Sequence, residues 1–378
     1  LGRITLVKPR LHGRYVDGQL TFGSLDPMIF TGSKEPFRLP DLDIAVRDGR
    51  GLMESDFGPV GIKVEGEGPL RDGFRGVIAA VAPKLAMAGC RAENASVFAK
   101  VAIDAERPQI DGPLRLGSLS CPEQGLRWSG AVLQAKGQID QAFDGGEGSV
   151  TLASGPLGLG TARLASTGGE ARVSYRKGAL VAHYDLNSSG IAAGGGSGRT
   201  PGGGGTVRGP DSFARLDGEG SVSGSGVEPG READAALAGL QRQAQGTLAE
   251  PLLARIRPAL MREARGSKLA GEFVLRRSAE ATSVVVPQAR LTGASGQSLL
   301  ALSRVQLTAN GGAAPVIAGN FVTGGAGLPR ISGRMERGAN RRLMTRLAMA
   351  DYAAGDASIA VPRLMVTQAR GGELGFAG

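Results

Sequence analysis

The chain has 378 residues, a formal net charge of +9 and a hydrophobic content of 41%. Glycine, at 62 residues, is about twice as frequent as usual, and aromatic residues make up only 4%, so Leu, Val, Ile and Ala must build any apolar face. The arginines are spread along the chain without interleaved aromatic residues, which argues against nucleic-acid binding. No apolar run of ~18 residues occurs, so the sequence contains no candidate transmembrane helix.

Alternation of apolar and polar residues is the dominant pattern, and it predicts β-strands with one dry and one wet face. Asp-Gly pairs at 17–18, 72–73, 111–112 and 217–218 are typical of tight turns between such strands. The chain is therefore expected to be mainly β. The apolar positions of the clearest runs are Leu42, Ile44 and Val46; Val60, Ile62 and Val64; Val97, Val101 and Ile103; and Phe273 and Leu275.

Two regions interrupt this pattern. Residues 190–209 are rich in glycine and predict a flexible loop, because they offer little apolar surface to bury. Residues 231–266 carry leucine and isoleucine at three- and four-residue spacing, which predicts a pair of helices. The pair is either a packing insert that covers one end of a sheet, or a gate or partner-docking element. The expected organisation is thus sheet (1–189), loop (190–209), strand (210–230), helical pair (231–266) and sheet (267–378).

Catalytic and metal-binding patterns are missing from the sequence. His12 and His183 are the two histidines, and both fall at positions expected to be solvated. Two histidines without a close cysteine pair do not make a zinc site. We therefore expect no catalytic residues, no metal and no cofactor, although two carboxylates could still meet in three dimensions to form a hydrolytic site.

A single sheet with one apolar face must close into a barrel, stack as a sandwich or curl over something apolar. A lipid tail suits the last of these, because each CH₂ removed from water contributes ~0.8 kcal/mol without any directional contact. The chain begins inside a strand-like pattern (RITLVKPRLHG, 3–13) and ends at GGELGFAG, which suggests a piece of a longer protein.

Several short motifs between residues 36 and 126 carry a family resemblance. They are RLPDLD at 38–43, FGPVG at 57–61, LRDGFRG at 70–76, and the cysteines within AGCR and LSCPE. In these motifs the chain resembles the YdbH-type branch of the AsmA-like intermembrane phospholipid transporters.

The resemblance implies a long curled antiparallel sheet that forms an elongated apolar groove with a short helical pair inserted. It implies a non-enzymatic, bridge-like segment that carries phospholipid acyl chains across the periplasm, in a parent protein anchored in the inner membrane. Membrane contacts would then lie outside this fragment, and an outer-membrane lipoprotein partner is allowed. The alternatives are a non-transporting envelope scaffold or adhesin-like protein and, less favoured, an enzyme acting on envelope glycans or lipids.

Cys90 and Cys121 are the two cysteines of the chain, and they match no metal or redox motif. An even count in a β-rich envelope protein favours one structural disulfide. We expect their Cα atoms ~4.4–6.8 Å apart. Two unrelated buried thiols are the alternative.

Overall fold

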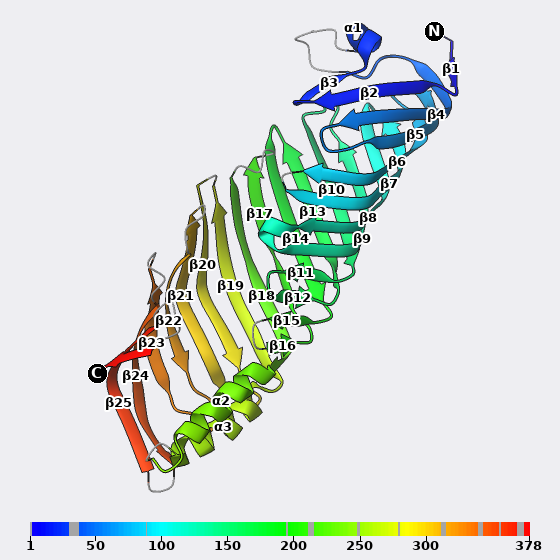
Figure 1. Ribbon diagram of the computed structural model, residues 1–378. Helices are drawn as coiled ribbons and strands as arrows, with labels where there is room; N and C mark the ends of the chain where they lie inside the picture. The colour runs from blue at the N-terminus through cyan, green and yellow to red at the C-terminus, as the bar shows by residue number, and fades with distance from the viewer. Residues whose placement is uncertain are drawn as a thin grey trace. The chain divides into compact units, whose positions relative to one another are not determined.

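The computed structural model describes residues 2–29, 38–87, 89–193, 196–210, 215–247, 250–278, 280–310, 315–338, 343–354, 357–368 and 374–378. The chain divides into two compact units, Leu1–Tyr184 (unit 1) and Asp185–Gly378 (unit 2), which are described separately. Strands dominate both units, and the two long helices belong to unit 2 (Figure 1). The expectation of a mainly β chain with a short helical pair is confirmed.

Unit 1 is built around a meander in which strands β4 to β10 pair antiparallel in chain order and β13 pairs with β10. The hairpin β11–β12 lies beside β9. The strands are β1 (Ile4–Val7), β2 (Arg10–Val16), β3 (Gln19–Thr21), β4 (Asp43–Ser55), β5 (Val60–Pro69), β6 (Phe74–Met87), β7 (Cys90–Asp104), β8 (Arg107–Cys121), β9 (Leu126–Ile139), β10 (Gly145–Ser154), β11 (Leu157–Leu159), β12 (Ala162–Leu164), β13 (Thr167–Arg176) and β14 (Ala179–Ser188), with helix α1 at Asp26–Ile29.

The expectation of a wholly antiparallel sheet is wrong at the N-terminal edge. Strands β1 and β2 both pair parallel with β4, with Ile4 opposite Ile44 and Arg10 opposite Arg50. A parallel pair needs a long connection rather than a tight hairpin. The long stretch between β3 and β4 provides it, so unit 1 contains a mixed sheet.

Of the Asp-Gly pairs for which the sequence predicts turns, those at residues 17–18 and 72–73 form them. The other two lie inside long strands, at 111–112 in β8 and 217–218 in β18 (Leu216–Pro229). At these two places the prediction of a turn is wrong, because pairing with a strand on each side keeps the backbone extended.

Unit 2 is a second meander, with antiparallel pairing in chain order from β17 to β26. Helices α2 (Arg231–Gln243) and α3 (Glu250–Ala264) connect β18 to β19, as the sequence predicts for 231–266. The other strands are β15 (Ile191–Ala193), β16 (Gly196–Gly198), β17 (Gly202–Pro210), β19 (Ser267–Arg277), β20 (Ala281–Thr292), β21 (Ser298–Asn310), β22 (Val316–Thr323), β23 (Ile331–Arg337), β24 (Leu343–Ala354), β25 (Ala357–Gln368) and β26 (Leu374–Ala377).

The prediction of a flexible loop at residues 190–209 is wrong. This stretch contains β15, β16 and most of β17, and β17 pairs residue by residue with β18 from Gly202 opposite Ser223 to Arg208 opposite Asp217. The side chains of this stretch offer little apolar surface to bury. Backbone hydrogen bonds need no side chain, so a neighbouring strand can order even a run of glycines.

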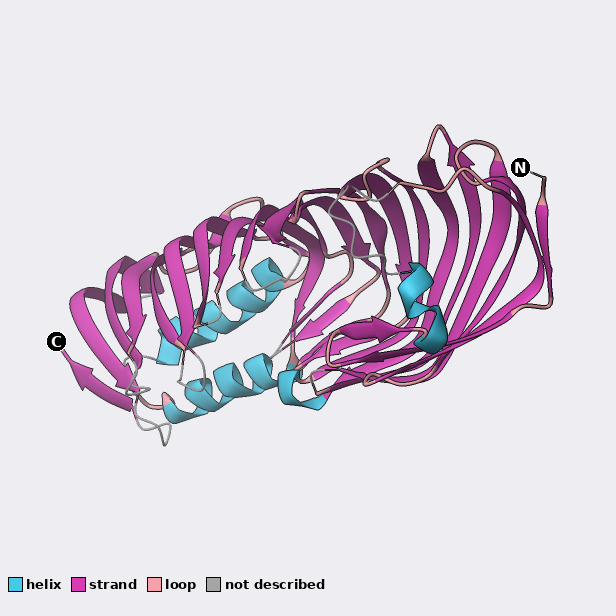
Figure 2. Cartoon of the chain, turned by 90° about the horizontal axis from the view of Figure 1, so that it is seen from above, coloured by secondary structure: helices cyan, strands magenta, loops and turns pink. Residues whose placement is uncertain are grey.

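Few side chains are fully buried in either unit. Most of the buried hydrophobic residues of unit 1 are small, such as Ala45, Ala82 and Ala99. In unit 2 a compact cluster joins helix and sheet, where Leu252 and Ile256 of α3 pack with Tyr352 of β24. Figure 2 shows α2 and α3 running beside the strands of unit 2. Apart from this cluster, the strands expose much of both faces.

Candidate functional site

The strand register of unit 1 brings the predicted groove residues of β4, β5 and β7 to one face of the sheet. Directly opposed residues lie on the same face, and side chains alternate along each strand. Ile62 is opposite Ala80, and Ala80 is opposite Val97. Val46 is opposite Gly66, which shares the face of Ile62. This face, called here the apolar face of unit 1, holds Ile44, Val46, Val60, Ile62, Val64, Val97, Val101 and Ile103.

Leu42 differs from the other candidates. It lies one residue before β4, and its carbonyl oxygen accepts a hydrogen bond of 2.8 Å from the amide of Leu70. Leu42 is half-buried, but the alternation of β4 does not include it.

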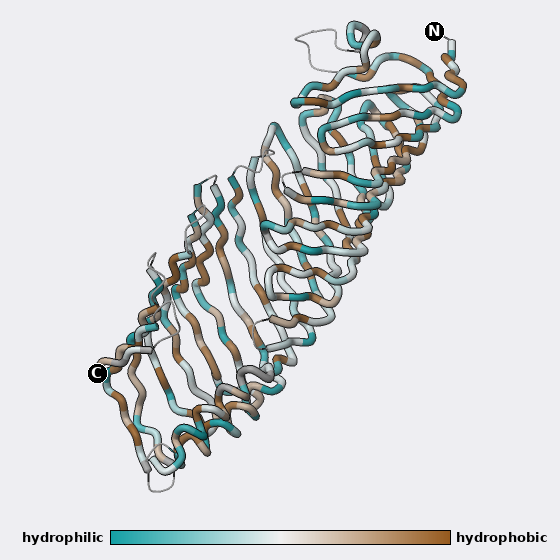
Figure 3. The backbone as a smooth tube through the Cα atoms, viewed as in Figure 1, coloured by the Kyte–Doolittle hydropathy of each residue, from teal (hydrophilic) through white to brown (hydrophobic). Residues whose placement is uncertain are grey.

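The apolar face continues across strands that the sequence analysis did not assign to it. Val97 is opposite Leu114 of β8, which is opposite Leu133 of β9, which is opposite Leu152 of β10. Several large side chains on this face remain accessible, with Ile78 36%, Ile110 38% and Leu114 39% exposed, whereas Ile103 is buried at 6%. Figure 3 shows the alternation of hydrophobic and hydrophilic residues along the strands. A sealed core would have buried these side chains.

Glycines form part of the apolar face where it is hollowed. A cavity of about 500 Å³ lies over residues that include Ile110, Ile139, Val150, Val173 and Tyr175. Its floor contains Gly137 and Gly148, which are opposite each other on β9 and β10. A Cβ atom on Gly148 would stand 2.7 Å from the carbonyl oxygen of Lys136, which is closer than real Cβ contacts. Glycine therefore lets neighbouring strands approach closely and keeps the floor free of side chains.

The opposite face of the same strands is mixed, because it carries charged side chains and also exposed apolar ones such as Val81, Phe98 and Val132. It carries a separate hollow of about 670 Å³, whose lining alternates in charge along one row, with Lys100 opposite Asp111 and Asp111 opposite Lys136. Exposed ion pairs are common on the outer surface, and the hydrogen bond from Arg50 lowers the pKa of Asp48. In the rows that line the two hollows, one face of unit 1 is therefore apolar and the other is charged.

The histidines take no part in the apolar face. His12 is exposed and lies 3.6 Å from Glu54, and His183 borders the polar hollow. Among the described residues, no group of His, Cys, Asp and Glu could hold a metal ion. No described helix is long and apolar enough to cross a membrane.

Phe273 and Leu275 lie on the apolar face of the unit 2 sheet. Leu269 lies on the same face of β19, because the three residues are an even number of positions apart along the strand. Leu269 is opposite Leu291, which is opposite Leu300. Leu291 and Leu300 line an apolar cavity of about 470 Å³, and the same cavity is bounded by α2 and α3. Phe273 and Leu275 share its face without lining it. We call this space the helix-covered cavity; its larger lining side chains are Leu237, Ile256, Leu260, Met261, Leu291, Leu299, Leu300, Leu328 and Ile331.

A buried carboxylate fastens α3 to the sheet beside this cavity. Glu263 is only 2% exposed, and it accepts hydrogen bonds from the hydroxyl and the amide of Ser295, at 2.6 and 3.3 Å. Tyr352 adds a second attachment, because its hydroxyl donates to the carbonyl of Gly327 at 2.8 Å and Arg255 stands over its ring.

Replacing Glu263 by alanine should therefore loosen α3. The change removes both hydrogen bonds from Ser295, and a hydrogen bond to a charged group contributes roughly 1.5–3 kcal/mol. Chemical denaturation and hydrogen exchange over α3 would measure the loss. Glu250→Ala is the matched control, because Glu250 is an exposed residue of the same helix that accepts a surface bond from the amide of Gly246. Equal effects of the two changes would contradict the anchoring role.

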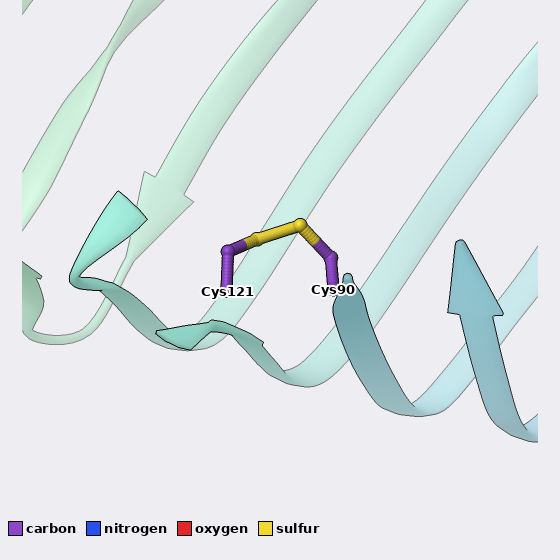
Figure 4. Close-up of a disulfide and its surroundings, with 2 residues drawn as sticks. All are labelled: Cys90 and Cys121. Carbon is purple, nitrogen blue, oxygen red and sulfur yellow. A yellow bond between two sulfur atoms is a disulfide. The ribbon is translucent and has the colours of Figure 1, made fainter. Parts of the chain in front are cut away.

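Cys90 and Cys121 are joined by a disulfide in the structure (Figure 4). They occupy opposed positions at the end of the β7–β8 pair, next to Arg91 opposite Ser120. Their Cα atoms are 4.1 Å apart, slightly closer than the expected range. The bond therefore ties together two neighbouring strands of the apolar face at one end.

Comparison with known proteins identifies one family. The family described as YdbH-like, intermembrane phospholipid transport protein YdbH, matches residues 1–375. No curated protein and no solved structure matches the chain.

Proposed function

Since the chain belongs to the YdbH-like family of intermembrane phospholipid transport proteins, we propose that it is a bridge-like segment that carries phospholipid acyl chains along its apolar sheet faces. The accessible apolar face of unit 1 is the observation that supports this most directly. Its central side chains Ile78, Ile110 and Leu114 are more than one third exposed although they lie in the middle of a sheet. Exposed apolar surface of this kind is typical of a binding surface.

The chemistry of the face suits an acyl chain. The rows of opposed residues consist of Val, Ile, Leu, Ala and Gly, and such side chains remove CH₂ groups from water without fixing the position of the chain. A tail could slide along the face because it breaks no hydrogen bond in moving. The charged rows on the other face would remain in water.

A role in intermembrane transport also suggests where the segment acts and what it works with. The segment would act in the periplasm, within a parent protein anchored in the inner membrane, and an outer-membrane lipoprotein could complete the path. The polar lipid headgroup would stay at the rim of the groove. No catalytic step is needed, because the lipid leaves chemically unchanged.

Two other functions make different predictions. A scaffold or adhesin-like protein would hold no lipid, and the apolar face would be a packing surface. An enzyme acting on envelope glycans or lipids would need two carboxylates, or a nucleophile and a base, within reach of each other in a cleft. The accessible apolar face favours lipid transport over both.

The test replaces Ile62, in the centre of the apolar face, by aspartate. Desolvating a carboxylate there should cost several kcal/mol, so most of the phospholipid that copurifies with the protein should be lost while the fold survives. Mass spectrometry of extracted lipids measures the loss, and circular dichroism with thermal unfolding follows the fold.

Val81→Asp is the matched control. Val81 belongs to the neighbouring strand β6, faces the other side of the sheet and is already 55% exposed. It should retain the wild-type amount of lipid. If Ile62→Asp unfolds the protein, or leaves its lipid content equal to that of Val81→Asp, the apolar face is a packed surface and the proposal fails.

A further inference from the structure

The helix-covered cavity of unit 2 is an apolar space that the protein leaves unfilled. Its lining is almost wholly apolar, and an accessible apolar hollow of this kind is typical of a binding site. The volume of about 470 Å³ lies within the range of ~300–1,000 Å³ that is usual for ligand pockets. Among the described lining residues Glu228 alone is charged, and it is paired with Arg199 at 3.5 Å. The space therefore suits an apolar ligand with a polar end at that rim.

The two helices play different parts around this cavity. Residues 252, 259 and 263 of α3 are buried and fix it to the sheet. Ile256, Leu260 and Ala264, spaced four residues apart, form the neighbouring stripe of α3 and line the cavity. Helix α3 is therefore a fixed wall, whose attachments do not depend on α2.

Helix α2 contributes one side chain, Leu237, to the lining. Asp234, Leu237 and Gln241 follow the i, i+3, i+7 spacing of one helix face. On either side of Leu237 this face is held by Arg257 of α3, which donates to Asp234 at 2.9 and 3.1 Å and to Gln241 at 3.4 Å. Both partners of the ion pair are partly exposed, so the contact is weak enough to open and close readily.

We infer that the helix-covered cavity is a holding site for one acyl chain of a phospholipid, and that α2 is its cover, held closed through Arg257. This inference rests on the proposed function. It adds a binding site for one acyl chain on the transport path, and a helix that controls the release of that chain. The adaptable side chain of Met261 in the lining would accommodate tails of different shape.

Occupancy is tested by photo-crosslinking in the purified full chain. A photoreactive phenylalanine analogue at Leu260, in the lining, should yield an adduct with the mass of a phospholipid. The same analogue at Gln243, which is exposed at the end of α2, should yield none. If the protein retains lipid but position 260 gives no adduct, the holding site is wrong and the proposed function stands. If the wild-type protein retains no lipid at all, both are overturned.

The cover is tested by the rate at which the protein releases an acyl-labelled fluorescent phospholipid to vesicles of phosphatidylethanolamine and phosphatidylglycerol. Arg257→Met and Asp234→Asn should each raise the release rate about fivefold, the factor expected for losing one partly exposed ion pair. Arg208→Met is the control, because Arg208 forms a surface ion pair of 3.0 Å with Glu219, away from the cavity lining. Release rates in both helix variants equal to that of the control would overturn the role of α2.

Discussion

Gly112→Ala is expected to destabilise unit 1 by about 3 kcal/mol, the upper part of the range for overpacking a close-packed position. A Cβ atom on Gly112 would overlap the carbonyl oxygen of Phe98 and stand 2.7 Å from the Cα atom of Ala99. Both neighbours are backbone atoms of the adjacent strand, so they cannot rotate away as a side chain could. The strands would have to separate, and hydrogen bonds between β7 and β8 would be lost.

Chemical denaturation, with hydrogen exchange over β7 and β8, measures this effect. Gly61→Ala is the control within the same sheet. A Cβ atom there would meet Cγ2 of Val81 at 3.5 Å and the carbonyl oxygen of Val81 at 4.0 Å, both ordinary contacts. Removing backbone freedom from the unfolded chain should make the control neutral or stabilising by ~0.4–1 kcal/mol. Similar stabilities of the two variants would contradict the close approach of β7 and β8 at Gly112.

Gly112 also illustrates a feature that the sequence could not predict, namely whether an Asp-Gly pair forms a turn or continues a strand. Asp-Gly at 17–18 and at 111–112 look alike in the sequence, yet the first forms a turn and Gly112 lies in the middle of β8. The choice depends on whether strands pair on both sides, which is a long-range property. The glycines of 190–209 were misread for the same reason, because their order comes from β18.

Alternation alone predicted which residues of unit 1 share a face, since the strand period of two needs no partner to be recognised. Ile62 and Val97 are more than thirty residues apart, yet the register places them on one face through Ala80. The extension through Leu114 was missed because the Asp-Gly pair concealed β8 as a strand. The helix-covered cavity was beyond prediction, since Leu237, Leu260 and Leu300 meet only through the packing of α3 on the sheet.

Removing the disulfide, by changing both Cys90 and Cys121 to serine, should cost about 3 kcal/mol. The bond closes a loop with a sequence separation of 31 residues and so restricts the unfolded chain. Because Cys121 is 4% exposed, a serine hydroxyl there would also be largely cut off from water. Hydrogen exchange should rise first at the end of β7 and β8 where the bond lies, since the rest of the pair keeps its backbone hydrogen bonds.

The wild-type protein treated with a thiol reductant should lose a similar amount of stability, because it loses the same constraint without any change of sequence. A second double variant, Cys90→Ala with Cys121→Ala, separates the two contributions, since alanine removes the bond without burying a hydroxyl. If all three forms unfold at the same denaturant concentration as the oxidised protein, the bond does not constrain the β7–β8 pair. If only the serine variant is destabilised, the buried hydroxyl is the cause and the cross-link contributes little. We expect the oxidised wild type to be the most stable form and the serine variant the least stable. The alanine variant and the reduced wild type should lie between them, with similar stabilities.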